Sequence, residues 1–209
     1  MNEVASAPGG ALDPGAGAVL VRRATANDAE AIAVLQDLAN EGHLSAYDWA
    51  WEGRDWRRVG AERIAANDTE MGLAWTIVAE RGGAVVGMLN YAEDAATNAP
   101  DDVMSRPFIA LRERLSPCLY LRAMAVLEGE RGGGVGRRLL DVALAAARAD
   151  AGRAVGVIVH EHNASLIGHY ERRGFGRVAT EPVVAHHAYP KGSLLIGLRL
   201  EGAGEGTRA

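Results

Sequence analysis

Apolar residues recur along this chain in two patterns that alternate with each other. Short runs of continuous or alternating apolar residues are typical of buried or half-buried strands. Such runs occupy Val19–Ala24, Leu73–Glu80, Ala84–Tyr91, Leu119–Leu127, Ala154–His160, Arg177–Val184 and Leu194–Leu200. Between several of them lie segments whose apolar residues repeat with helical spacing. The sequence therefore predicts strands interleaved with helices.

The first half of the chain also carries recognisable boundary signals. A first helix is expected to begin after Thr25 or Asn27, either of which suits an N-cap, and to end near Gly42. Segment 45–67 is expected to form a second helix or two short ones. Arg81-Gly82-Gly83 separates two strand patterns, which is a strong hairpin signal.

A glycine-rich turn separates the strand pattern at Leu119–Leu127 from a helical pattern. The turn reads Arg131-Gly-Gly-Gly134-Val-Gly136, and the helical face begins at Val135. The N–H groups at a helix start attract anions such as phosphate, and glycine lets the backbone approach a ligand closely. The residues alone leave two interpretations open: a phosphate-binding turn, or a tight turn followed by solvated arginines.

Two better-known phosphate loops do not match this turn. A Walker loop needs a lysine after its last glycine, and Val135 stands at that position after Gly134. A dinucleotide-binding fingerprint needs a third glycine, and Leu139 stands where that glycine would follow Gly136. What remains is an R-x-x-G-x-G pattern between a strand and a helix.

A second stretch, 163–175, has a spacing of its own. Asn163 suits a helix N-cap, Tyr170 follows, and Gly174-Phe175 closes the helix. Together with the glycine turn, this stretch resembles the two signatures of the GCN5-related N-acetyltransferase (GNAT) family. The resemblance implies a single-domain α+β fold of three layers, with a central mixed, mostly antiparallel twisted sheet of about seven strands flanked by helices. It also implies a V-shaped splay between the fourth and fifth strands.

The resemblance further implies that acetyl-CoA is the cosubstrate. Backbone N–H groups of the fourth strand would hold the pantetheine arm, and the glycine turn would hold the pyrophosphate. The cofactor-binding residues implied in this way are Met124, Ala125, Val126, Arg131, Gly132, Gly133, Gly134, Val135, Gly136, Arg137, Asn163 and Tyr170. No metal is expected, because His160 and His162 alternate on one strand face without a third ligand at a suitable spacing.

Tyr170 is the candidate general acid for catalysis. A phenol with a pKa near 10 stays protonated at neutral pH and could donate its proton to the leaving sulfur. Spacing alone favours a different role, because Leu166 and Ile167 lie on the same helix face and Tyr170 could be a core aromatic residue. The occurrence of Tyr170 seven residues after Asn163, in a chain that also has the glycine turn, favours the catalytic role instead.

The general base stays open at this stage. Some members of the resembled family carry a glutamate early on the fourth strand, where this chain has Tyr120 and Arg122. Glu93, His160 and Glu161 are candidates at strand ends, and a water chain is another route for the proton.

Aromatic and acidic residues are concentrated in segment 45–67. They include Tyr47, Trp49 and Trp56, and such groups suit either packing against the sheet or an organic cation. In the resembled family this region often borders the acceptor site, so we expect the acceptor pocket between Tyr47–Trp56 and His186–Tyr189.

Length and composition limit the remaining possibilities. The chain has 209 residues and a net charge of −5, which argues against a nucleic-acid-binding surface. We expect a disordered segment at 1–17, one N-acetyltransferase domain at 18–201 and a tail at 202–209. The insertion 92–117 is expected to cover one rim of the cleft or to form a contact in a homodimer. A single cysteine, the lack of a long apolar run and the lack of a signal-peptide pattern predict a cytoplasmic protein without a membrane partner.

The function implied by the resemblance is N-acetylation of a primary amine on a small molecule or a peptide. The amine would attack the thioester directly, with Tyr170 as general acid. Two alternatives stay open: a catalytically silent acyl-CoA-binding sensor or module, and an acyltransferase that uses a longer acyl group or a hydroxyl acceptor.

Overall fold

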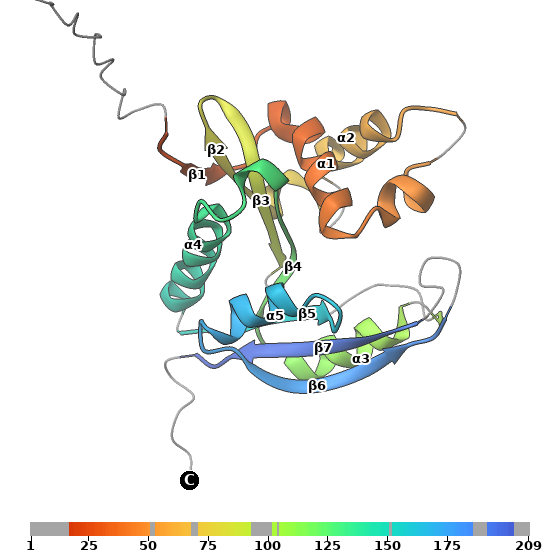
Figure 1. Ribbon diagram of the computed structural model, residues 1–209, viewed down its shortest axis with the longest axis vertical. Helices are drawn as coiled ribbons and strands as arrows, with labels where there is room; N and C mark the ends of the chain where they lie inside the picture. Colours follow the sequence, from red (N-terminus) through yellow and green to blue (C-terminus); the bar gives the residue numbers. More distant parts are fainter. Residues whose placement is uncertain are drawn as a thin grey trace, which may run out of the picture.

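In the described part of the chain, seven strands form one sheet in the order β1-β2-β3-β4-β5-β7-β6 (Figure 1). The pair β4 and β5 is parallel, and the other neighbours are antiparallel. The predicted mixed, mostly antiparallel sheet is therefore confirmed. The strands are β1 (Leu20–Arg23), β2 (Thr76–Arg81), β3 (Ala84–Ala92), β4 (Leu119–Val126), β5 (Val155–His160), β6 (Gly176–Val183) and β7 (Ser193–Leu200).

The computed structural model describes residues 17–50, 53–67, 71–92, 102–103, 105–150, 152–185 and 192–202, apart from the side chain of Tyr47. Its helices are α1 (Ala29–Ala39), α2 (Trp56–Ala66), α3 (Arg106–Leu115), α4 (Val135–Ala149) and α5 (Ala164–Glu171). Short helical turns, η1 (Ala26–Asp28), η2 (Leu44–Asp48), η3 (Leu73–Trp75) and η4 (Glu128–Glu130), join them. Segment 45–67 thus contains α2 and most of η2. Among the described residues, no helix is both long and apolar enough to cross a membrane.

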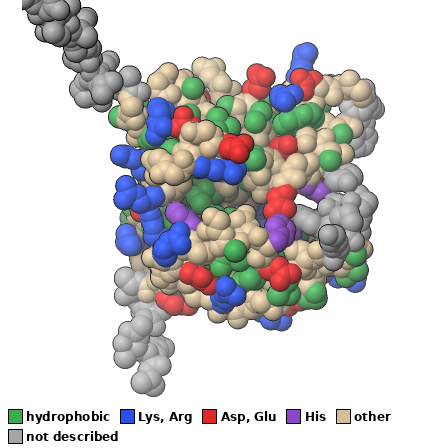
Figure 2. Space-filling model, in the orientation of Figure 1, with side chains coloured by type: hydrophobic (Ala, Val, Ile, Leu, Met, Phe, Trp, Pro, Cys, Tyr) green, Lys and Arg blue, Asp and Glu red, His purple; other side chains and the backbone are tan. Residues whose placement is uncertain are grey.

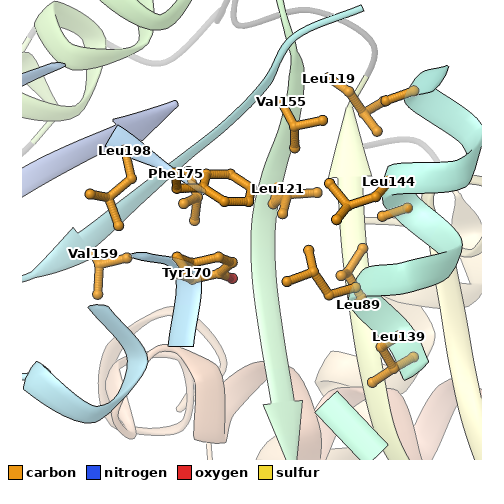
Figure 3. Close-up of a cluster of buried hydrophobic side chains, with 14 of the residues drawn as sticks. Leu89, Leu119, Leu121, Leu139, Leu144, Val155, Val159, Tyr170, Phe175 and Leu198 are labelled. Carbon is orange, nitrogen blue, oxygen red and sulfur yellow. The ribbon is translucent and has the colours of Figure 1, made fainter. Parts of the chain in front are cut away.

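The helices cover both faces of the sheet. Helices α1 and α2 bury Ile32 and Ile64 with Val78 of β2 on one face, while α4 and α5 cover the other. The cluster beneath α4 and α5 contains Leu139 and Leu121 and is the largest apolar core of the described residues (Figure 3). Helix α3, which comes from the expected insertion, packs on the sheet half that contains β5, β7 and β6.

The hairpin between β2 and β3 forms at the predicted place. Gly82 and Gly83 have φ angles of 57° and 81°, and a two-residue turn with positive φ at both positions matches the twist of the flanking strands. Residues with a Cβ rarely adopt this conformation, which is why the glycine pair marks the turn in the sequence.

A partly buried ion pair lies at the start of α1. Asp28 is 6% exposed and accepts hydrogen bonds from Arg22 Nη1 at 2.7 Å and Arg22 Nη2 at 2.9 Å. The backbone N–H and the hydroxyl of Thr25 also donate to this carboxylate, each at 2.8 Å. The hydrogen bonds from Arg22, and then those from Thr25, hold the pKa of Asp28 well below its usual range despite burial.

The fourth and fifth strands pair over only a short distance. The parallel ladder joins Leu119–Leu121 to Val155–Val157 and then stops. Beyond it, β4 continues to Val126 beside β3, whereas β5 continues beside β7. The sheet therefore opens into the V expected from the resemblance.

A β-bulge accompanies this opening. On β3, Tyr91 pairs with Leu121 and the preceding Asn90 pairs with Ala123, so Arg122 is the extra residue on β4. The sequence spacing did not reveal the bulge. It bends β4 at the point where its ladder with β5 ends.

Helix α4 lies close to the sheet because β3 carries a glycine beneath it. A Cβ on Gly87 would lie 3.0 Å from Val135 Cγ1 and 3.1 Å from the carbonyl oxygen of Ala125. Both distances are tighter than ordinary contacts, so a side chain at this position would push the first turn of α4 away from β4. Gly87 thus sets the position of the glycine turn relative to the open edge of the sheet.

Candidate active site

A cavity of about 620 Å³ lies beside the open edge of β4. Figure 2 shows a hollow between the upper and lower halves of the molecule, with Arg side chains gathered on one side of it. The cavity is lined by the end of β4, the glycine turn, the start of α4, one side of α5 and the end of α1. Its residues are Leu38, Ala39, Glu41, Met124, Ala125, Val126, Glu130, Arg131, Gly132, Gly134, Val135, Gly136, Arg137, Asn163, Ser165, Leu166, His169, Arg172 and Arg173.

The structure brings most of the predicted cofactor-binding residues to this one cavity. Met124, Ala125 and Val126 line it from β4, and Asn163 lines it from the start of α5. Six of the seven predicted turn residues, all except Gly133, line it as well. The individual roles of these residues in coenzyme binding stay predictions.

The glycine turn offers a row of backbone donors. Gly134, the N-cap of α4, has a φ of 79° and supplies no side-chain cap. Within the described part of the chain, no backbone acceptor engages the N–H groups of residues 132–137, and the first such bond of α4 runs from Arg138 to Gly134 at 3.0 Å. These donors, together with the helix dipole, make the turn a site for an anion.

Arginine side chains add positive charge around the turn. Arg131, Arg137, Arg172 and Arg173 all line the cavity. Arg173 pairs with Asp141 at 2.8 Å, whereas Arg137 and Arg172 have no carboxylate partner among the described residues. The arginine end of the cavity can therefore hold more than one negative charge.

Gly133 lies behind the turn rather than in the cavity. A Cβ there would lie 3.4 Å from Arg81 Nη2, and Arg81 forms an ion pair with Glu130. This ion pair joins the β2–β3 hairpin to the turn and so holds the turn in place.

Asn163 has the structural role that its sequence position predicts. Its Oδ1 accepts a hydrogen bond from the backbone N–H of Leu166 at 3.2 Å, which caps α5. Because Asn163 also lines the cavity, capping and ligand binding are compatible roles for it.

Tyr170 lies beneath the cavity, not on its lining. The side chain is 1% exposed and packs against Phe175, with ring centroids 5.2 Å apart. Its hydroxyl end points toward β4 (Figure 3). Burial, with a smaller contribution from Tyr120, raises the pKa of the phenol well above 10, so the group stays protonated at neutral pH. The general-acid role of Tyr170 stays a prediction.

Of the base candidates from the sequence, His160 and Glu161 do not line the cavity, and Glu93 lies outside the described residues. Glu161 Oε1 accepts from the backbone N–H of Leu194 at 3.1 Å. His160 Nδ1 lies 2.9 Å from Ser193 Oγ, and burial is the main cause that lowers the pKa of His160. Among the described residues, no three potential ligands gather closely enough to hold a metal ion.

Sequence reasoning missed the contributions of α1 and α5 to the cavity. Leu38 and Ala39 come from the end of α1 and Glu41 from just after it. His169 comes from α5, and Arg172 is the C-cap of α5. The α5 residues lie inside the second signature, so their helical spacing from Asn163 could have predicted that they line the same cavity. The α1 residues carry no local signal, because only the tertiary fold brings them to β4.

The aromatic segment is placed mainly in the core. Trp49 is 3% exposed and stacks on Trp56 with ring centroids 6.2 Å apart. This arrangement favours the packing interpretation for Trp49 over the acceptor pocket. The side chain of Tyr47 and the loop His186–Tyr189 lie outside the described residues.

Comparison with known proteins agrees with the family resemblance of the two sequence signatures. A model of the acetyltransferase (GNAT) family matches residues 39–175. Among curated proteins, none matches the chain. Solved structures share the fold. One, described as an acetyltransferase, has a TM-score of 0.62 and 22% identity and covers 88% of this chain and 99% of its own.

Two further structures carry more specific names. The first, yncA from Salmonella typhimurium, is described with its cofactor acetyl-CoA; it has a TM-score of 0.59, 17% identity and coverage of 91% of this chain and 98% of its own. The second is a ribosomal-protein-alanine N-acetyltransferase from Brucella melitensis, with a TM-score of 0.57, 22% identity and coverage of 87% of this chain and 99% of its own.

Proposed function

Because this chain belongs to the acetyltransferase (GNAT) family, we propose that it transfers an acetyl group from acetyl-CoA to a primary amine of a small molecule or a peptide. The observation that carries the proposal is the cavity that joins the glycine turn to the open edge of β4. Both features suit a coenzyme, since the N–H groups at a helix start bind a pyrophosphate well and strand groups at an open edge can bond the pantetheine amides.

The proposed reaction is a direct attack on the thioester. A neutral amine adds to the acetyl carbon, and an oxyanion develops on the carbonyl oxygen. Backbone N–H groups of Met124–Val126 would stabilise that charge, an effect worth about 2.7–4 kcal/mol for each well-placed donor. Tyr170 would protonate the leaving thiolate, and because burial raises its pKa the phenol still carries its proton at neutral pH.

The names of the structural neighbours guide the choice of acceptors. One neighbour is described as acting on a ribosomal-protein alanine, and another name refers to phosphinothricin. A suitable panel therefore contains a peptide that begins with alanine, phosphinothricin, an arylalkylamine such as tyramine and a polyamine such as spermidine.

The test is release of free coenzyme A thiol with each amine, combined with mass spectrometry of the product. We expect turnover with at least one amine and a product heavier by one acetyl group. Calorimetric titration with acetyl-CoA should show binding by the wild type and none by Gly134→Asp, because that substitution places bulk and negative charge in the turn. Unchanged affinity of Gly134→Asp would refute the assignment of the turn.

One observation favours a second candidate, a coenzyme-binding module that performs no transfer. Tyr170 is almost fully buried and does not line the cavity. Such a module would bind acetyl-CoA and lose that binding on Gly134→Asp, yet release no thiol with any amine. The same two measurements therefore separate the two candidates.

A further inference from the structure

Glu41 is the carboxylate at the end of the cavity formed by α1. Among the described residues, two acidic side chains line the cavity, Glu41 and Glu130. Glu130 is held by Arg81 in an ion pair at the glycine turn, so its charge is neutralised there. Glu41 has a histidine rather than an arginine as its partner. It is therefore the acidic group best able to respond to a ligand in the cavity.

The backbone at Glu41 is in an unfavourable conformation. Its φ is 55°, in the left-handed region that residues with a Cβ rarely adopt. The residue follows the C-cap of α1, where glycine or asparagine is the usual choice, and Gly42 comes next. A glutamate at this position gains nothing for the helix end. Strain of this kind is concentrated at sites where a side chain has a function.

A long-range hydrogen bond fixes the direction of the Glu41 side chain. His162 Nε2 donates to Glu41 Oε1 at 2.8 Å, from a residue 121 positions away in the chain. His162 is itself held by a stack on His160, with centroids 5.2 Å apart and planes inclined by 23°. His160 in turn bonds Ser193 of β7. The carboxylate is thus oriented by a set of contacts from the end of β5.

These contacts contribute little to stability. Glu41 and His162 have side chains that are 42% and 51% exposed, and exposed ion pairs are weak. The unfavourable backbone at Glu41 and its weak pair with His162 together give no gain in stability. We therefore look for their advantage in function.

Charges of both signs line the cavity. Arg131 and Arg137 come from the glycine turn and the start of α4, and Glu41 comes from the residues just after α1. An anionic coenzyme fits the arginines, and a cationic amine fits Glu41.

We propose that Glu41 binds the ammonium group of the acceptor and accepts its proton, and that His162 is the positioning residue for this carboxylate. The inference rests on the proposed function and assigns the base that β4 lacks. No carboxylate occurs at Tyr120 or Arg122, and Glu41 supplies one from α1 instead.

The proton and electron balance is complete. Glu41 takes one proton from the ammonium group and later releases it to water. The nitrogen lone pair attacks the acetyl carbon, the carbon–nitrogen bond forms, and the carbon–sulfur bond breaks with its electron pair on sulfur. The second nitrogen proton passes to water as the amide forms. The thiolate gains one proton from Tyr170, which takes a proton back from water.

The test compares Glu41→Gln with wild type, using the best amine of the panel. Glutamine keeps an oxygen that can accept from His162 and removes the charge. We expect kcat/KM for the amine to fall roughly 10²–10⁴-fold, the range of a positioned base, with unchanged acetyl-CoA affinity. Glu30→Gln, an exposed change on α1, is the matched control and should leave both the kcat/KM for the amine and the acetyl-CoA affinity unchanged.

A second pair of measurements separates a chemical role from a structural one. Near pH 9.5 a lysine-like amine is already partly deprotonated, so the deficit of Glu41→Gln should shrink. The titratable groups that adjoin Glu41 are His162 and, behind it, His160.

Glu41→Gly should lose the same activity while its Tm stays level or rises, because glycine adopts a positive φ without strain.

The positioning role of His162 has its own comparison. His162→Gln can place an amide N–H near the position of Nε2, so it should retain most of the kcat. His162→Ala removes the donor and should lower kcat with little change in Tm. Equal losses in the two variants would overturn the positioning role.

Each outcome decides the proposal. If wild type turns over an amine and Glu41→Gln keeps more than about half of its kcat/KM, the assignment of Glu41 is wrong and the proposed function stands. A deficit that is independent of pH, or a Glu41→Gly variant with a lowered Tm, also overturns it. If wild type binds acetyl-CoA but reacts with no amine, the proposed function fails, and this assignment fails with it.

Discussion

Replacing Tyr170 with phenylalanine removes one hydroxyl group and keeps the ring. The ring packs against Phe175 and is 1% exposed, so the variant should retain its apolar contacts. No hydrogen bond of this hydroxyl occurs among the described residues, and loss of the group should therefore cost about 1 kcal/mol or less. For a chain of this size, that corresponds to a Tm shift of no more than roughly 2–4 °C.

The expected effect on turnover is much larger. A positioned general acid contributes roughly 10²–10⁴-fold, which corresponds to about 2.7–5.4 kcal/mol of the activation free energy. The affinity for acetyl-CoA should change little, because the proton moves only as the carbon–sulfur bond breaks. The difference between a small stability effect and a large kinetic effect is what identifies an acid.

The assay is kcat at saturating acetyl-CoA, with single-turnover rates in case product release is limiting. Tyr120→Phe is the matched control, because Tyr120 is also buried and burial raises the pKa of its phenol to about 12. A folded Tyr170→Phe variant with more than about half of the wild-type turnover would show that Tyr170 is a core residue only. An equal loss in Tyr120→Phe would indicate a general effect of removing a buried hydroxyl.

Two further predictions concern the scaffold of the site. Gly87→Val should displace α4, lower stability by about 1–3 kcal/mol and weaken acetyl-CoA binding in calorimetry, whereas Gly129→Ala, which has open space around it, should change neither. Asp28→Asn should lower the unfolding free energy at pH 7 by about 2–3 kcal/mol, between the values for exposed and buried pairs. The folded-state pKa of Asp28 is depressed, so the contribution of its carboxylate to the unfolding free energy is present above the unfolded-state pKa of 3.8. That contribution is lost progressively as the pH falls below 3.8 toward the folded-state pKa. Urea denaturation should therefore show a smaller difference in unfolding free energy between Asp28→Asn and wild type at pH 3 than at pH 7.

The sequence predicts those parts of the fold that local chemistry determines. The hairpin followed from Gly82-Gly83, whose positive φ angles few other residues adopt. The cap of α5 followed from Asn163, and the start of α4 followed from the glycine turn. In each case the residue type and the local conformation are linked within a few positions, so the signal needs no tertiary information.

The remaining parts depend on contacts between distant segments. The bulge at Arg122 arises from the register between β3 and β4, and no residue type marks it. Glu41 reaches the cavity only because α1 packs beside β4, and Trp49 is buried because α2 covers it. Sequence spacing cannot distinguish a pocket aromatic residue from a core aromatic residue when both lie on an amphipathic segment.

The short ladder between β4 and β5 has a consequence for how free energy is distributed in the molecule. Among the described residues, the strand pairing between the two parts of the sheet is limited to Leu119–Leu121 and Val155–Val157, so the two parts can act as separate cooperative units of unfolding. A ligand that occupies the opening contacts both units at once. Its binding free energy then adds to their mutual attachment, by RT ln(1 + [L]/Kd) for a ligand that binds only the joined state. A bound coenzyme would thus stabilise the association of the two parts of the sheet as well as react. This stabilisation would be lost when the coenzyme leaves and regained when the next one binds.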